Sequence, residues 1–181
     1  MPRQIDSIAA GRFRNLMSTF PSGVAVVTTV GRHGTPYGMT VSSLCSLSLK
    51  PALLLVSLRR GSETLAEVVW RGVFAVNLLH LGGREAAIVF SSPAPARFAA
   101  VGWDTTPIWS LPALPEHAHT TMECAVDNVV AAGDHTLVIG KVAGATGWRE
   151  DAVPLLYGLR RYEAWPDEPA FHGLATAERA E

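Results

Sequence analysis

Two long runs of β-forming residues, separated by a short turn, constrain the fold of this chain more than any other feature. Thr121–Ala131 and Thr136–Ala145 contain several Val, Ile and Thr residues and flank the turn Ala132-Gly133-Asp134-His135. Gly and Asp are residues that tight turns favour. The pattern predicts a hairpin of two long antiparallel strands. The fold therefore has to be built around antiparallel pairing.

Five further runs predict strands, and short segments containing Gly and Pro separate several of them. The runs are Gly23–Val30, Tyr37–Leu47, Ala52–Leu58, Phe74–Leu79 and Gly158–Trp165. Short connections favour antiparallel neighbours, whereas a doubly wound parallel sheet needs a helix after most strands. The sequence therefore predicts a mainly β fold, a closed antiparallel barrel with flanking helices.

Three segments predict the helices. Ile5–Phe20 has apolar residues at helical spacing, with Asp6 or Ser7 as the N-cap, and Pro21 ends it because the residue before a proline avoids helical angles. Gly83–Phe90 predicts a short helix.

The third helix, Ser62–Trp70, is predicted with Ser62 as N-cap and with Leu65, Val68 and Val69 facing inward.

Domain organisation follows from length and from the distribution of proline. A chain of 181 residues fits one domain, which we place at residues 1–165. Ser91–Pro115 contains several prolines and predicts an ordered but irregular excursion, anchored by Trp103 and Trp109. Residues 166–181 are rich in Pro, Ala and charge and are expected to form a C-terminal tail.

Charge and apolar patterning exclude several classes of partner. The formal net charge is -1 and the positive residues are scattered, whereas nucleic-acid binding needs a concentrated basic face. No run approaches the roughly 18 apolar residues of a membrane span, and Met1–Arg14 lacks the apolar stretch of a signal peptide. We therefore expect a cytoplasmic protein in which Cys45 and Cys124 remain thiols.

The 48% share of hydrophobic residues is a slight excess that an interface would cover, so we expect a homodimer.

The segment Gly38–Ser48 carries a cluster of small hydroxyl side chains between strongly apolar strands. On one strand, Thr40, Ser42, Ser46 and Ser48 would share a face. An exposed strand face is the alternative interpretation, but such a face mixes in larger charged residues, and this segment has none. A strip of small hydroxyls and backbone amides suits contact with the polar edge of a ring system or with a polyol chain.

A second cluster lies where the strand Ala52–Leu58 passes into the following helix. Ser57, Ser62 and Thr64 surround the predicted helix N-terminus, and Arg59 and Arg60 add positive charge. Free amides and the helix dipole there favour a phosphate group. The alternative is that Ser62 only caps the helix.

The histidines carry less information. The turn does not require His135, and a lone histidine is more often structural than functional. His117 and His119 have a spacing that metal ligands sometimes share, with Glu123 as a distant third residue, but a solvated loop is the preferred interpretation and we expect no metal. The chain has no G-x-G-x-x-G after a strand, no phosphate-binding loop and no G-x-S-x-G elbow. A nucleotide would therefore have to be bound by the barrel itself.

Six motifs follow one another along the chain. They are Phe20-Pro21-Ser22-Gly23-Val24-Ala25-Val26-Val27-Thr28-Thr29, Gly38–Ser48 with Pro51 after it, Gly72-Val73-Phe74-Ala75-Val76-Asn77-Leu78-Leu79, Met122-Glu123-Cys124, Gly133-Asp134-His135 and Pro154-Leu155-Leu156-Tyr157. In this order and at these distances they resemble the short-chain flavin reductases that serve two-component flavin monooxygenases. The resemblance runs from about Phe13 to Tyr162. The chain departs from the pattern at Ala52, where a second proline is usual; this position lies on the approach to a strand.

The resemblance implies a split antiparallel β-barrel of the Greek-key, FMN-binding type, assembled as a homodimer, that binds FAD or FMN without a covalent bond. The residues that it assigns to the flavin are Gly38, Met39, Thr40, Val41, Ser42, Ser43, Val56, Ser57, Leu58, Ser62, Thr64, Phe90 and Ser91. Those that it assigns to the nicotinamide nucleotide are His135, Tyr157, Arg160 and Tyr162.

The resemblance further implies an NAD(P)H:flavin oxidoreductase that releases reduced flavin to a partner monooxygenase. FAD and NADH are the expected cofactors, with FMN and NADPH as alternatives. His135 is the candidate catalytic residue, expected to orient the nicotinamide carboxamide or a dinucleotide phosphate and not to transfer a proton. A non-catalytic flavin- or haem-binding split barrel and a flavin-dependent ferric-chelate reductase remain the alternative functions.

Overall fold

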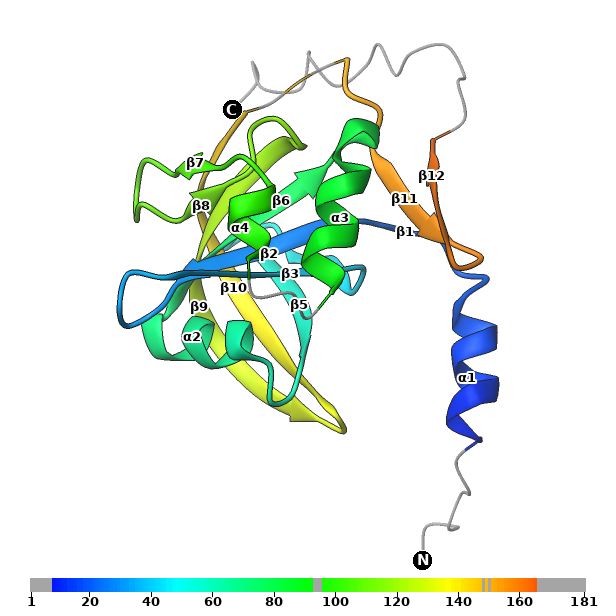
Figure 1. Ribbon diagram of the computed structural model, residues 1–181. Coiled ribbons are helices and arrows are strands. Elements are labelled where there is room, and N and C mark those ends of the chain that lie inside the picture. The colour runs from blue at the N-terminus through cyan, green and yellow to red at the C-terminus, as the bar shows by residue number, and fades with distance from the viewer. Residues whose placement is uncertain (1–7, 93–95, 148, 150, 166–181) are drawn as a thin grey trace, which may run out of the picture.

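Strands dominate the chain, as the computed structural model shows for residues 8–92, 96–147, 149 and 151–165 (Figure 1). The helices are α1 (Ala10–Met17), α2 (Glu63–Arg71), the 3-10 turn η1 (Leu81–Gly83), α3 (Arg84–Ser91) and α4 (Arg97–Ala100). The strands are β1 (Ser22–Gly23), β2 (Ala25–Val30), β3 (Pro36–Val41), β4 (Leu44–Ser48), β5 (Leu53–Arg59), β6 (Val73–Leu79), β7 (Asp104–Thr105), β8 (Pro112–Ala113), β9 (Ala118–Ala132), β10 (His135–Thr146), β11 (Leu155–Gly158) and β12 (Arg161–Ala164).

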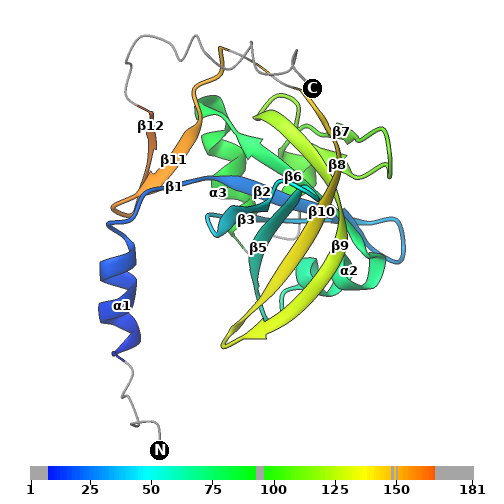
Figure 2. The ribbon, with the colours of Figure 1, turned by 180° about the vertical axis from the view of Figure 1, so that it is seen from behind.

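The main sheet has seven strands in the order β3-β2-β6-β9-β10-β5-β4, and every neighbouring pair is antiparallel. Its two edge strands, β3 and β4, follow each other in the sequence, so the sheet has to curl until its edges approach (Figure 2). A separate sheet has the order β1-β11-β12. The predicted mainly β, split antiparallel barrel is confirmed.

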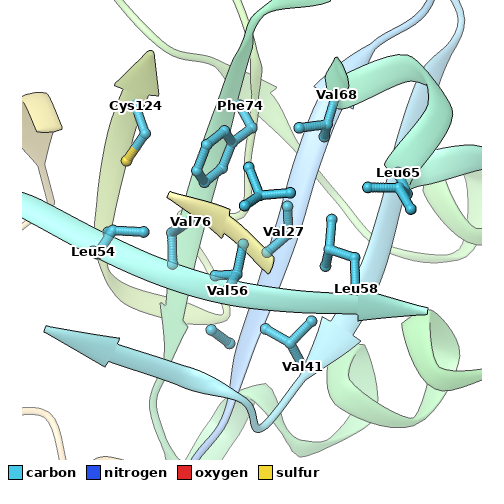
Figure 3. Packing of buried hydrophobic residues seen from close by; sticks show 12 residues of the cluster. Val27, Val41, Leu54, Val56, Leu58, Leu65, Val68, Phe74, Val76 and Cys124 are labelled. Atoms are coloured by element: carbon cyan, nitrogen blue, oxygen red, sulfur yellow. The ribbon is translucent and has the colours of Figure 1, made fainter. Parts of the chain in front are cut away.

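The inside of the curled sheet is the main hydrophobic core. Alternate residues of β5, namely Leu54, Val56 and Leu58, point inward and meet Val27 of β2 and Phe74 of β6 (Figure 3). Helix α2 closes one end of the barrel through Leu65 and Val68. Complete burial of each such side chain stabilises the fold by about 1.5–3 kcal/mol.

A second core lies on the outer face of β2 and β6. Because strand side chains alternate, Val26 of β2 points to this face while Val27 points into the barrel. Ala86, Ala87 and Phe90 of α3 cover it. Tyr157 and Tyr162, from the β11–β12 hairpin, pack against the same cluster. Strand β2 is therefore buried on both faces, and it joins the barrel to α3 and to the small sheet.

The predicted long hairpin is confirmed as β9 and β10. Ala132 pairs with His135 across the two-residue turn Gly133-Asp134. Gly133 has a positive φ of 60°, a conformation that glycine adopts without a steric cost. The last residues of β9, from Asp127 onward, are exposed, so this end of the hairpin extends beyond the packed part of the barrel.

Three predicted strands are broken in the structure. Tyr37–Leu47 is not one strand: β3 ends at Val41 and β4 begins at Leu44, because β3 pairs with β2 and β4 pairs with β5 at the opposite edge of the sheet. Gly158–Trp165 contains the turn of the β11–β12 hairpin. Gly23–Val30 divides at Val24, where the chain passes from the small sheet to the large one.

The helix predictions are confirmed at α2 and α3 and are too long at α1. The Ser62 hydroxyl accepts a hydrogen bond from the Leu65 N–H at 3.3 Å, as an N-cap does. Val69, predicted to face inward, is 47% exposed. The predicted helix Ile5–Phe20 shortens to α1, whose N-cap is Ala9 and whose C-cap is Ser18; the proposed caps Asp6 and Ser7 lie outside the described residues.

The excursion after α3 is fixed by two buried polar side chains of the barrel. The Glu123 carboxylate accepts hydrogen bonds from the Thr106 hydroxyl (2.6 Å) and from the N–H groups of Ile108 (3.0 Å) and Trp109 (2.8 Å). The Asn77 side-chain oxygen accepts from the Leu114 N–H at 2.9 Å. Buried polar groups are costly unless they are paired, so these bonds hold the excursion in one arrangement. Of the two predicted anchors, Trp103 lies edge-on to Phe98, whereas Trp109 is held through its backbone N–H.

No helix in the described part of the chain is long and apolar enough to cross a membrane. The predicted C-terminal tail, residues 166–181, lies outside the described residues.

Candidate functional site

The break between β3 and β4 replaces the continuous hydroxyl strip that the sequence predicts. Ser42 and Ser43 lie at the break and are exposed. The Ser43 hydroxyl donates to the Ser57 carbonyl at 2.8 Å, and the Ser57 N–H donates back to the Ser43 carbonyl at 3.3 Å. Thr40 instead donates its hydroxyl to the Ala87 carbonyl of α3 at 2.7 Å. The small hydroxyls therefore divide between two edges of the sheet and do not share one face.

Gly38 lies beneath aromatic side chains of α3 and the excursion. A Cβ atom at this position would be 2.9 Å from Phe90 Cε1 and 3.2 Å from Phe98 Cζ. Arg97 donates from its Nη1 to the Gly38 carbonyl at 2.7 Å. The missing side chain of Gly38 thus lets α3 and α4 pack on β3. Nothing in the sequence motifs indicates Arg97, which only the tertiary fold brings to this strand.

Five of the assigned residues line one hollow between the barrel and the small sheet. Its lining consists of Val24, Thr40, Ser42, Ser91, Tyr157 and Tyr162, and its volume is about 230 Å³. Thr40, Ser42 and Ser91 come from the set assigned to the flavin, whereas Tyr157 and Tyr162 come from the set assigned to the nicotinamide nucleotide. We call this space the tyrosine hollow. Sequence reasoning did not include Val24, which lies at the division between β1 and β2.

Tyr157 and Tyr162 stand directly opposite each other on β11 and β12, with ring centroids 5.2 Å apart and planes tilted by 55°. Burial raises the pKa of Tyr162, neighbouring Tyr157 raises it further, and the positive charge of Arg84 acts in the opposite direction. The Tyr162 phenol is therefore protonated at neutral pH, and it can donate a hydrogen bond.

An apolar hollow of about 170 Å³ adjoins the tyrosine hollow and shares Val24 with it. Its other lining residues are Gly23, Leu44, Leu78, Leu79, His119, Pro154 and Leu155. Burial lowers the pKa of His119, and nearby His80 lowers it further, so this imidazole is neutral at neutral pH. Glu123, the distant third residue of the metal interpretation, is engaged by the excursion. Within the described ranges, no three His, Cys, Asp or Glu residues are placed to hold a metal ion.

The residues of the predicted phosphate corner lie near the turn of the long hairpin. Arg60 donates its N–H to the Asp134 carbonyl at 3.0 Å and its Nη1 to the Gly133 carbonyl at 3.3 Å. Ser62 caps α2, and Thr64 is buried with 3% exposure.

Several other residues assigned to the flavin have side chains in the hydrophobic cores. Val41, Val56, Leu58 and Phe90 are at most 5% exposed, and Met39 packs against the same barrel core. Only the backbone of the buried four is available to a ligand.

His135 lies at this corner and does not line the tyrosine hollow. It pairs with Arg59 across β10 and β5, and its Nδ1 is 2.8 Å from Asp134 Oδ1. This hydrogen bond and the charge of His135 lower the pKa of Asp134. The bonds between Ser43 and Ser57 connect the two regions, because Ser57 lies two residues before Arg59 on β5.

Arg160, also assigned to the nicotinamide nucleotide, donates instead to the Asn15 side chain of α1. It does not line the tyrosine hollow.

Comparison with known proteins places the chain in a family. The model of the flavin reductase like domain matches residues 17–166. The flavin reductase (NADPH) of Lentzea aerocolonigenes is 45% identical over 161 residues, which are 89% of this chain and 93% of that protein. The flavin-dependent monooxygenase reductase subunit HsaB of Rhodococcus jostii (strain RHA1) is 31% identical over 157 residues, 87% of this chain and 78% of HsaB.

A solved structure agrees with these sequence relatives. The NADH:FAD oxidoreductase SgcE6 of Streptomyces globisporus C-1027, in complex with NAD and FAD fragments, is similar with a TM-score of 0.84 and 28% sequence identity. The similarity covers 93% of this chain and 99% of that one. With the antiparallel barrel and the ordered motifs already described, these matches show that the chain belongs to the flavin reductase-like family.

Proposed function

We propose that this chain transfers a hydride from NADH to FAD and releases the reduced flavin, with NADPH and FMN as alternative cofactors. The family match over residues 17–166 carries the proposal. The tyrosine hollow supports it, because that hollow brings together residues assigned to the flavin and residues assigned to the nicotinamide nucleotide.

The chemistry of the two adjoining hollows fits a flavin. An isoalloxazine has a polar pyrimidine edge and an apolar dimethylbenzene edge. The tyrosine hollow offers hydroxyl groups, and the apolar hollow beyond Val24 offers Leu44, Leu78 and Leu155. The Ser42 hydroxyl has no hydrogen-bond partner among the described residues, so it is available to a ligand. Ser42 and the neighbouring backbone would hold the polar edge.

Hydride transfer needs little acid–base machinery from the protein. When bound, the flavin supplies the electron-accepting ring and the reduced nicotinamide supplies the hydride. Hydroxyl and N–H donors at the Ser42-Ser43 break would stabilise the negative charge that reduction creates. Tyr157 and Tyr162 would pack against the nicotinamide and exclude water. His135 would orient the dinucleotide from the hairpin turn.

Mixing the purified full chain with NADH and FAD tests this function directly. We expect the absorbance of the reduced nicotinamide to fall with multiple turnovers in air, because oxygen reoxidises released flavin. Flavin binding without NADH or NADPH oxidation, tried with both FAD and FMN, would instead support a non-catalytic flavin-binding barrel. Faster anaerobic turnover on addition of a ferric chelate would support the ferric-chelate reductase.

A monooxygenase that consumes reduced flavin is the proposed partner. The support is the similarity to a protein named as a monooxygenase reductase subunit.

The proposed cellular location is the cytoplasm, where nicotinamide nucleotides are abundant and where the exposed thiol of Cys45 stays reduced. We also propose that residues 1–165 form one domain, since β2 contributes to both hydrophobic cores.

A homodimer is proposed from the surface of α1. This helix buries none of its residues, and Phe13, Leu16 and Met17 are 48–56% exposed. It stands away from the barrel in both views (Figures 1 and 2). An eight-residue helix is too short to be stable without packing. A second copy of the chain would cover this apolar face.

A further inference from the structure

Arg84 lies on a helix that borders the tyrosine hollow, although it does not line the hollow itself. It is the first residue of α3, the helix whose last residue, Ser91, lines the hollow. In the segment just before Arg84, the Leu81 N–H donates to the Val153 carbonyl at 2.8 Å. His80 and Pro154 form an isolated antiparallel β-bridge. These bonds place the start of α3 next to the start of β11, which carries Tyr157.

Arg84 is exposed. Among the described residues it has no hydrogen bond and no ion pair. Glu163, the acidic residue of the small sheet, is paired with Arg161 at 2.9 Å. The charge does not stabilise its own helix either, because a cation in the first turn faces the positive end of the helix dipole. The positive charge of Arg84 does act on the hollow, because it lowers the pKa of Tyr162, a lining residue, against the effect of burial.

The size of the hollow indicates where the charged part of a ligand must lie. A volume of about 230 Å³ is below the 300–1,000 Å³ of sites that enclose a small ligand. A nicotinamide ring held there would leave its phosphate groups outside, at the rim. A guanidinium forms charge-assisted hydrogen bonds with phosphate oxygens.

We propose that Arg84 binds a phosphate group of the nicotinamide dinucleotide at the rim of the tyrosine hollow. The inference rests on the proposed function, because it takes the side of the tyrosine hollow formed by Tyr157 and Tyr162 as the nicotinamide site, with the flavin edge at Ser42. Two sources of phosphate share this chemistry: the pyrophosphate, present in both NADH and NADPH, and the 2′-phosphate, present only in NADPH.

The test compares Arg84→Gln with the wild type and with Lys141→Gln, an exposed position on β10 that loses the same charge. Titration calorimetry measures the dissociation constants of NAD⁺ and NADP⁺ for the FAD-saturated protein. Quenching of flavin fluorescence measures the dissociation constant of FAD, and it also reports that each variant is folded. Turnover of NADH and NADPH with FAD is measured in parallel.

We expect Arg84→Gln to weaken NADP⁺ binding about tenfold, with FAD affinity unchanged and with partial recovery in Arg84→Lys. Equal weakening of NAD⁺ would identify the pyrophosphate, whereas unchanged NAD⁺ affinity would identify the 2′-phosphate. The inference is overturned if Arg84→Gln binds both dinucleotides as Lys141→Gln does, or if it loses FAD affinity. If the wild type showed no turnover, the proposed function would be rejected. The inference about Arg84 would still be tested, because the dissociation constants of the dinucleotides are measured separately from turnover.

Discussion

At the scale of single residues, His135 is held in place by its own turn. Its Nδ1 is bonded to Asp134, and the Gly133 and Asp134 carbonyls are tied to Arg60. The imidazole is partly exposed, with 41% of its side chain accessible, so its Nε2 edge can meet a ligand without a rearrangement of the hairpin.

Replacement of His135 by Ala is expected to raise the KM for NADH about five- to tenfold, the effect of losing one hydrogen bond of about 1–1.5 kcal/mol. The flavin dissociation constant should stay nearly unchanged, because Ser42 and Ser43 lie at the break between β3 and β4, outside the hairpin turn. Steady-state kinetics and flavin titration measure the two quantities. An unchanged KM would show that His135 does not contact the dinucleotide.

Cys124 gives a pH dependence of stability. Burial raises the pKa of this thiol to about 12 from an ordinary value of 9, and neighbouring Glu123 adds to the rise. Between these pH values the unfolded chain loses the proton while the native chain keeps it. The free energy of unfolding should therefore be unaffected by this group below pH 9 and should fall above it, by about 1.4 kcal/mol per pH unit.

Urea unfolding of the wild type and of Cys124→Ala, repeated at several pH values from 8 upward, measures this slope. The variant should lose less stability per pH unit above pH 9, although its stability at pH 8 is lower because of the lost core contact. Cys45→Ala, at the exposed thiol of β4, is the matched control. Equal slopes in the wild type and in Cys124→Ala would contradict the prediction.

At the scale of secondary structure elements, the β11–β12 hairpin is unusual in its turn. Leu159 and Arg160 both have positive φ, 50° and 61°, in a two-residue turn that favours Asn and Gly. The Arg160 side chain bonds Asn15 of α1, and the Leu159 N–H bonds the Ser18 carbonyl at 2.5 Å. The hairpin that carries both tyrosines is thus connected to α1 through a strained turn.

Exchange of Leu159-Arg160 for Asn-Gly is expected to raise the free energy of unfolding by about 1–2 kcal/mol, because left-handed angles cost residues with a side chain about that much. Denaturant titration measures the change, and Leu159→Ala, which keeps its Cβ atom, should give no such gain. A less stable Asn-Gly variant would show that the contacts with α1 outweigh the strain.

At the scale of the whole molecule, the exposed face of α1 is expected to determine assembly. Phe13→Ser combined with Leu16→Ser removes two large apolar side chains, which contribute about 2 kcal/mol each when buried. Light scattering after size exclusion should show a dimer for the wild type and a monomer for this variant, with Arg12→Gln on the same helix remaining dimeric. A monomeric wild type, or a double variant that remains dimeric, would contradict the proposed interface.

Sequence reasoning succeeded where the information is local. The β9–β10 hairpin follows from β-forming residues and a Gly-Asp turn within one continuous segment, Ala118–Thr146. The N-cap of α2 follows from Ser62 and the apolar spacing after it. The reasoning failed at Tyr37–Leu47 and at Gly158–Trp165, where no Gly or Pro lies at the break: Ser42-Ser43 in one case and Leu159-Arg160 in the other.

The sequence by itself determined that this chain is an antiparallel barrel, and its ordered motifs identified the family. Tertiary structure alone decided how the site is assembled, because strand pairing and packing depend on residues far apart in the chain. Pairing of β3 with β2 and of β4 with β5 created the break at Ser42. Packing of the β11–β12 hairpin against α3 brought Tyr157 and Tyr162 to that break and brought Arg84 within electrostatic reach of Tyr162.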